Sequence, residues 1–185
     1  MAINLKDALA LISSFSNTPS FSNTPSLQFI ATDNAPKADS NIELVQYLQS
    51  VCPSASVQFE AVGHPVDLLA TDQVSPQPDM FTQLTGELGK WDSDWLLIAH
   101  EGGDPIIVKP SEQGEFSPVY SAMQGMGFWD FAPIADSIGQ FLVCVSAIQH
   151  ALNFPGLGQP LDDDFNLAPA AANWLFPFLR QHAGA

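Results

Sequence analysis

Residues 91–142 carry the pattern that most restricts the fold of this chain, because short apolar runs alternate there with turn residues. The run Trp95–Ala99 has the length and composition of a strand buried on both faces. Glu101–Asp104 contains two glycines and predicts a tight turn, and the β-branched run Pro105–Val108 follows it. A third strand is expected over Ser117–Tyr120, with Pro118 at its start or at a sheet edge. The pattern therefore predicts antiparallel strands near residues 95–99, 105–109 and 117–121.

A helix is predicted over residues 133–152. Pro133 suits the first turn of a helix, where the N–H that proline lacks has no acceptor in any case. The apolar residues that follow recur at spacings of three and four, which is typical of an amphipathic helix. They are Ile134, Ile138, Phe141, Leu142, Val145 and Ile148. We expect Ile138 and Phe141 on the buried face of this helix.

Four pieces of this region resemble, in this order, the core of the SUKH superfamily, the cell-wall-assembly-regulator (Smi/Knr-like) type of domain. They are the apolar strand, the hairpin sequence Gly103–Ile106, the pair Val119-Tyr120, and the Ala-x-Ser-x-x-x-Phe-Leu pattern of Ala135–Leu142. The resemblance covers about residues 91–142, and the family's N-terminal Leu-Pro helix and Asn-Gly turn are not visible here. It implies a protein-binding role, either as a bacterial immunity protein that neutralises toxins, often nucleases, or as a regulatory scaffold in cell-wall synthesis control.

The N-terminal half predicts two helices. Residues 3–15 fit a helical stripe loosely. Ser40–Glu43 has the pattern of a capping box, with a hydroxyl at the cap and a carboxylate three residues later, and predicts a helix to about Ser50. The candidate buried face of this helix consists of Ile42, Val45 and Leu48.

Strands are expected between this helix and the central region. Residues 56–62 alternate between apolar and polar side chains, which predicts a strand with one wet face, and residues 66–70 are its expected partner. Residues 27–31 have the length of a further short strand. Residues 79–88 predict a short helix, which Gly86 weakens.

The chain ends in a second amphipathic segment from about Ala168, with Pro177 expected to kink or divide it. Its apolar side consists of Trp174, Leu175, Phe178 and Leu179. Before it, Asp162–Asp164 is interpreted as charge at a helix N-terminus rather than as a calcium site. The repeat of residues 15–20 as residues 21–26 indicates a local duplication that lengthened a surface loop.

These elements predict an α+β fold in which an antiparallel sheet is packed on one side by helices, in a SUKH-like arrangement. A chain of 185 residues is long enough for a substantial core and most simply forms one domain. We therefore expect a single domain over residues 1–185, with a divergent N-terminal region over 1–90 and an extra C-terminal helical segment over 160–185.

The charge of the chain restricts its partners. Twenty Asp and Glu stand against five Lys and Arg, which gives a formal net charge of −15. Nucleic acid is not expected as a direct partner, because binding phosphates requires a basic surface. A basic protein is expected instead, since opposite charges steer the encounter of two proteins. The alternative is that the acidity serves solubility alone. The sequence makes no prediction of the oligomeric state.

The chain is expected to be cytoplasmic. Its N-terminus lacks a basic leader followed by an apolar core, and no run approaches the ~18 apolar residues that a membrane span needs. The two cysteines, Cys52 and Cys144, are expected to be reduced. Cys144 lies among apolar residues of the predicted helix, which predicts a buried thiol.

Few residues of this sequence suggest chemistry. His100, Glu101 and Asp104 mix a histidine with carboxylates, but no second histidine lies at ligand spacing, so a solvated turn is favoured over partner contact, catalysis or a metal site. Phe128–Phe131 places three rings in four residues, which either close one end of the core or present an anchor to a partner. The candidate partner-binding residues are Glu101, Asp104, Glu115 and Trp129.

The sequence contains no nucleophile elbow, phosphate loop, Cys-x-x-Cys pair or dinucleotide fingerprint. No catalytic residue, cofactor or metal is therefore predicted. The expected function is non-enzymatic protein binding, with immunity against a nuclease-type toxin as the first hypothesis. A regulatory scaffold in cell-wall synthesis control is the alternative, and a hydrolase that uses the hairpin acids is a further one.

Overall fold

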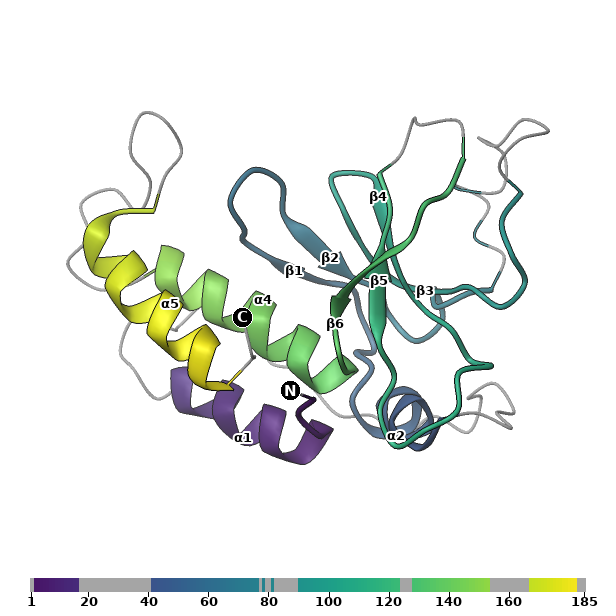
Figure 1. Cartoon of the computed structure of the whole chain (residues 1–185), viewed down its shortest axis with the longest axis horizontal. Helices are drawn as coiled ribbons and strands as arrows, with labels where there is room; N and C mark the ends of the chain where they lie inside the picture. The colour runs from purple at the N-terminus through teal and green to yellow at the C-terminus, as the bar shows by residue number, and fades with distance from the viewer. Residues whose placement is uncertain are drawn as a thin grey trace.

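A computed structural model describes residues 2–16, 41–76, 78, 81, 90–123, 128–153 and 167–182. Six antiparallel strands lie side by side in chain order, from β1 to β6, and helices pack on the sheet (Figure 1). The chain therefore has an α+β fold. The strands are β1 (Val57–Phe59), β2 (Val66–Leu68), β3 (Leu96–Glu101), β4 (Asp104–Val108), β5 (Val119–Ser121) and β6 (Ala132–Ala135). The helices are α1 (Leu5–Ser16), α2 (Ile42–Ser50), α4 (Ile138–Leu152) and α5 (Pro169–His182).

The predicted central strands are confirmed as β3, β4 and β5, and the pairing of β1 with β2 is confirmed as well. Strand β3 is buried on both faces, because Leu96 and Ile98 point into the core beneath the helices while Leu97 points to the opposite face. Its hairpin with β4 turns through Gly102 and Gly103, whose φ angles are +55° and +108°. Glycine adopts such angles at no steric cost, so the turn prediction from the sequence is confirmed.

The predicted start of the central helix is wrong. Pro133 lies in β6, which pairs with β5, and α4 begins only at Ile138. Strand β6 is an edge of the sheet, where proline is tolerated because no second neighbour needs its N–H. The register shifts along β5, so that Ile134 is an extra residue and its side chain is 48% exposed instead of lying on the helix face.

Ser137 supplies the true start of α4. Its side-chain oxygen accepts a hydrogen bond from the N–H of Gln140 at 3.0 Å, as an N-cap residue does. The same hydroxyl accepts from the N–H of Ile3 and donates to its carbonyl, which fixes the N-terminal segment against α4. Gly139 permits this approach, since a Cβ there would lie 2.3 Å from the Ile3 carbonyl oxygen.

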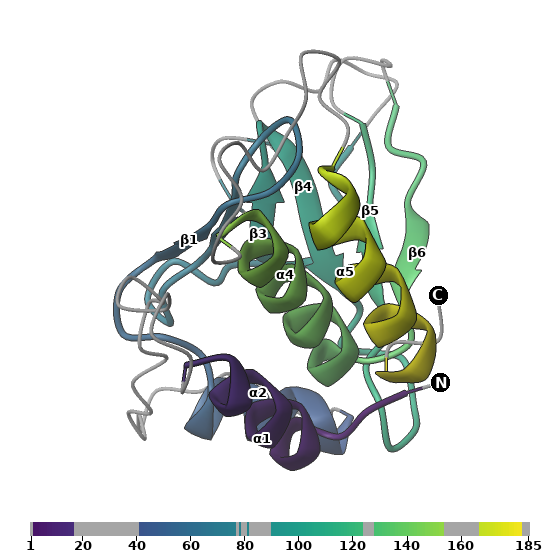
Figure 2. The ribbon, with the colours of Figure 1, turned by 90° about the vertical axis from the view of Figure 1, so that its left-hand side faces the viewer.

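The helices form a layer on one face of the sheet, with α4 at its centre, α5 outside it, and α1 and α2 at one end (Figure 2). The buried face of α4 contains Ile138, Phe141 and Leu142, as expected, and packs on apolar side chains from β1 to β5. Helix α1 confirms the helix predicted over residues 3–15 and buries Leu5 and Ala8 in the same core.

Helix α2 exists as predicted, but its cap and its buried face differ from the prediction. Asn41 is the N-cap residue, and its side chain accepts a hydrogen bond from the N–H of Glu43 at 3.0 Å. Ile42 is 61% exposed, whereas Glu43 is 3% exposed. The helix is turned relative to the expected orientation, because the Glu43 carboxylate binds buried backbone N–H groups. The buried residues of α2 are Glu43, Leu44, Tyr47 and Leu48.

Helix α5 confirms the C-terminal amphipathic segment and continues through Pro177 rather than being divided there. Its apolar side packs on α4 and on Phe15 of α1, with Leu175 buried and Trp174 and Phe178 stacked on each other. Residues 27–31, the repeat beyond Ser16, Asp162–Asp164 and nearly all of residues 79–88 lie outside the described residues. Among the described helices, none has the length and apolar character needed to cross a membrane.

Candidate functional site

The face of the sheet opposite the helices carries a layer of aromatic side chains, which we call the aromatic face. It rests on the buried side chains of Leu69, Leu97 and Ile107. The rings of its phenylalanines and tryptophans are in mutual contact, with centroids 4.6–6.1 Å apart and mostly edge to face. The aromatic face consists of Phe81, Trp91, Trp95, Tyr120, Trp129 and Phe131.

The aromatic face is partly exposed. Phe81 is fully buried at its centre, whereas Trp91, Trp95 and Trp129 each keep part of their surface exposed. Beside it, Phe128 is 52% exposed and Met123, just after β5, is 68% exposed. Trp129 and Phe131 of the aromatic loop pack on this face of the sheet, whereas Phe128 is exposed. That the loop presents an anchor to a partner stays a prediction.

The tryptophans of this face differ in how firmly they are held. The Nε1–H of Trp91 donates to the carbonyl of Trp95 at 3.2 Å. The Nε1 atom of Trp129 is buried and has no hydrogen-bond partner among the residues that the structure describes. A buried N–H without an acceptor is unfavourable, so Trp129 is held less firmly than Trp91.

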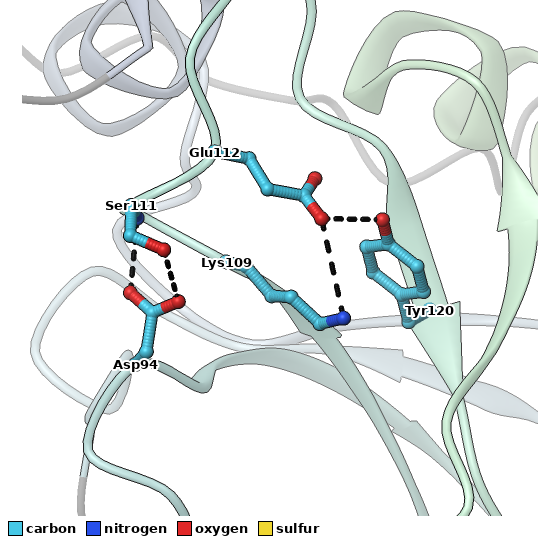
Figure 3. A network of polar contacts seen from close by, with 5 residues as sticks. All are labelled: Asp94, Lys109, Ser111, Glu112 and Tyr120. Carbon is cyan, nitrogen blue, oxygen red and sulfur yellow. Dashed lines mark hydrogen bonds and ion pairs between the residues drawn. The ribbon is translucent and has the colours of Figure 1, made fainter.

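A polar network fixes the loop between β4 and β5 beside this face (Figure 3). Asp94 accepts hydrogen bonds from the N–H of Ser111, at 2.9 Å, and from its hydroxyl. The hydroxyl of Tyr120 donates to Glu112 at 2.6 Å, and the Lys109 ammonium lies 4.0 Å both from Glu112 and from the centre of the Tyr120 ring. Burial and the neighbouring Glu112 raise the pKa of Tyr120 to about 12, so the phenol stays a neutral donor.

The β3–β4 hairpin gathers the other candidate residues. Glu101 and Asp104 are cross-strand neighbours, and Asp67 lies opposite His100, with 3.5 Å between its carboxylate and the His100 Nδ1. Burial and then the charge of Asp104 raise the pKa of Glu101, while His64 acts in the opposite direction. Among the described residues, no group of three or more His, Cys, Asp or Glu has the geometry to hold a metal ion.

The structure does not bring the four predicted partner-binding residues together. Glu101 and Asp104 lie side by side at the start of β4, whereas Glu115 lies in the exposed loop beyond its other end. Trp129 belongs to the aromatic face. The sequence groups these residues as one site, but they occupy three separate places. Strand β4 and the turns at its two ends separate residues that are close in the sequence.

Sequence reasoning missed a buried carboxylate that joins distant parts of the described chain. Glu43 of α2 accepts hydrogen bonds from the backbone N–H groups of Ser117, Ile138 and Gly139, at 2.8, 3.2 and 3.0 Å. It joins α2, the segment before β5 and the N-terminus of α4, where a negative charge is favourable. Its capping-box position marked it as a helix cap, and no sequence signal revealed that its partners are distant in the chain. With both oxygens occupied inside the core, it serves the fold.

The two thiols are not suited to nucleophilic chemistry. Cys52 and Cys144 are both free, and Cys52 is buried. Cys144 is only partly buried, contrary to the fully buried thiol that was expected, and the burial raises its pKa to about 11. A thiol with a raised pKa carries little thiolate near neutral pH.

Comparison of the chain with models of protein families, with curated proteins and with solved structures yielded no match.

Proposed function

We propose that this chain is a non-enzymatic protein-binding domain that acts as an immunity protein and neutralises a basic, nuclease-type toxin. The sequence resemblance of residues 91–142 to SUKH domains supports the class of function. A nuclease presents a positive surface to nucleic acid, and an acidic protein can cover such a surface. The free thiols of Cys52 and Cys144 are in keeping with a reducing compartment, and we place the protein in the cytoplasm.

The observation that carries this proposal is the uncompensated acidity of the chain, twenty acidic residues against five basic ones. Some of these acidic side chains lie at turns and loops between the strands of the sheet. Glu101 and Asp104 flank the β3–β4 hairpin, and Glu115 is exposed on a loop whose base is fixed by the Asp94–Ser111 contact. Carboxylates on rigid turns are ready to meet a basic surface without a large loss of conformational freedom.

The proposal predicts a toxin gene beside the gene for this chain, and the test uses the C-terminal domain of that toxin. We expect the purified chain to abolish the nuclease activity of that domain at an equimolar ratio, and its expression to protect cells that produce the toxin domain. The complex should form faster at low salt than at high salt, because salt screens the attraction. Full nuclease activity in the presence of excess folded chain would contradict the proposal.

A further inference from the structure

We propose that the aromatic face is the surface through which this chain contacts its partner, and that the partner lays arginine or lysine side chains on its half-buried indole rings. The inference rests on the proposed function, since it names the surface that a basic protein would occupy. It assigns the anchor role to Trp91, Trp95 and Trp129, with Phe128 at the border.

The geometry of the aromatic face favours contact on its surface. Its rings touch one another, so a side chain can lie on the layer but cannot enter it. Two exposed apolar side chains adjoin this face in the sequence, Phe128 next to Trp129 and Met123 just after β5. Aromatic residues of this kind dominate the binding energy of protein interfaces, because they bury a large area at low entropic cost.

The charges around the aromatic face indicate a cationic occupant. Asp92 and Asp130 are exposed and adjoin Trp91 and Trp129 in the sequence. Asp94 and Glu112 lie in the neighbouring loop network. The described cations of this region are Lys90, which is exposed, and Lys109, which is already paired with Glu112 and placed over Tyr120.

Arginine and lysine are attracted to the face of an indole ring, and nearby carboxylates strengthen the attraction. A second copy of this chain is disfavoured as the occupant, because it would bring the same carboxylates and a net charge of −15 against this surface.

The edge of the sheet argues for contact through side chains rather than through an added strand. Strand β6 is exposed at this edge, but Pro133 has no N–H to donate to an incoming strand. The extra residue Ile134 interrupts its regular pairing. Both features are those by which proteins prevent strand addition at sheet edges. A partner is therefore expected on the face beside this edge.

The fluorescence of tryptophan provides a direct test, because three of the four tryptophans of the chain lie in the aromatic face. The fourth, Trp174, packs on α1 and α4 in the helical layer. In a Trp174→Phe protein, all indole emission comes from the aromatic face. We expect a tetra-arginine peptide amide to change this emission saturably at low salt, tetra-lysine to do so more weakly, and tetra-glutamate to have no effect.

A matched pair of variants locates the binding. Phe128 and Phe176 are the same residue type with nearly equal exposure, 52% and 49%, but Phe176 lies on α5 in the helical layer. In the Trp174→Phe background, we expect Phe128→Ser to weaken binding of tetra-arginine about three- to tenfold, and Phe176→Ser to leave it unchanged. Asp130→Asn should also weaken binding. Its control is Glu60→Gln, at an exposed position beside β1, the strand at the opposite edge of the sheet from β6.

The inference is overturned if tetra-arginine leaves the emission unchanged, if Phe128→Ser and Phe176→Ser have equal effects, or if the chain dimerises through this face. Measuring the same variants with the basic toxin domain separates the two proposals. If the toxin domain is neutralised and Phe128→Ser has no effect, the proposed function stands and the surface is wrong. If tetra-arginine binds at the aromatic face and no toxin is neutralised, the surface stands and the immunity function is wrong.

Discussion

Glu43 shows how much a single side chain determines in this fold. Its carboxylate is buried and accepts three hydrogen bonds from the main chain of two distant segments. Burial raises the pKa of Glu43, although these hydrogen bonds act in the opposite direction. A raised pKa means that the folded state holds the proton more tightly than the unfolded chain does, so protonated Glu43 favours folding.

The raised pKa of Glu43 determines how this residue makes stability depend on pH. The contribution of Glu43 is fully present below its pKa in the unfolded chain and is lost as the pH rises through its higher pKa in the folded state. We therefore expect the free energy of unfolding of the wild type to fall, relative to Glu43→Gln, as the pH rises from about 4 toward 7. Urea unfolding of both proteins in the same buffers measures this difference, since all other carboxylates are common to the two. If the free energy of unfolding of the wild type instead rises relative to Glu43→Gln with rising pH, the hydrogen bonds outweigh burial in their effect on the pKa of Glu43.

At the scale of the element, two residues that the sequence places on one helical stripe belong to different elements, Phe141 to α4 and Ile134 to β6. Phe141 is 4% exposed in the core, whereas Ile134 is 48% exposed on β6. We expect Phe141→Ala to reduce the free energy of unfolding by about 3–5 kcal/mol, because it empties a packed aromatic site. Ile134→Ala should change it by less than about 1 kcal/mol, as is usual for exposed positions. Chemical denaturation of both variants measures these changes. A large loss of stability for Ile134→Ala would show that Ile134 is buried, as the predicted helix from Pro133 requires.

The elements that the sequence predicts correctly are those with a local cause. The β3–β4 hairpin follows from apolar runs and two turn glycines, and α1 and α5 follow from periodicity. The start of α4 is not predictable in this way, because Pro133 suits both a helix start and an edge strand, and only the pairing with β5 decides between them. The orientation of α2 depends on partners of Glu43 that lie more than seventy residues away. The aromatic face likewise joins Phe81, Trp91 and Trp129 from separate segments, so the sequence suggests its rings but not their assembly.

At the scale of the whole molecule, two kinds of surface are available to a partner. The aromatic face offers short-range contact, whereas the net charge of −15 acts at longer range and influences the rate of encounter. The Glu101–Asp104 hairpin is the place where the sequence predicts the electrostatic centre. Its two half-buried carboxylates oppose each other across the strands, which keeps them close together at one end of the sheet.

Reversal of the charges of Glu101 and Asp104 tests whether the negative charge of the hairpin steers the partner toward it. We expect Glu101→Lys with Asp104→Lys to slow association with the basic toxin domain roughly tenfold at low salt, because steering raises association rates by about 10 to 10³. The effect should vanish near 1 M salt, where the screening length is about 3 Å. Stopped-flow measurement of the association rate, with thermal unfolding to confirm the fold, provides the readout.

The control is Asp7→Lys with Glu60→Lys, which changes the net charge equally, from −15 to −11, at exposed positions on α1 and beside β1. A slower rate for the hairpin pair than for the control would place the steering at the hairpin. Equal slowing of the two would assign the steering to the net charge of the whole molecule. If neither pair slows association, the acidity serves solubility, and the partner must be recognised by short-range contacts such as those of the aromatic face.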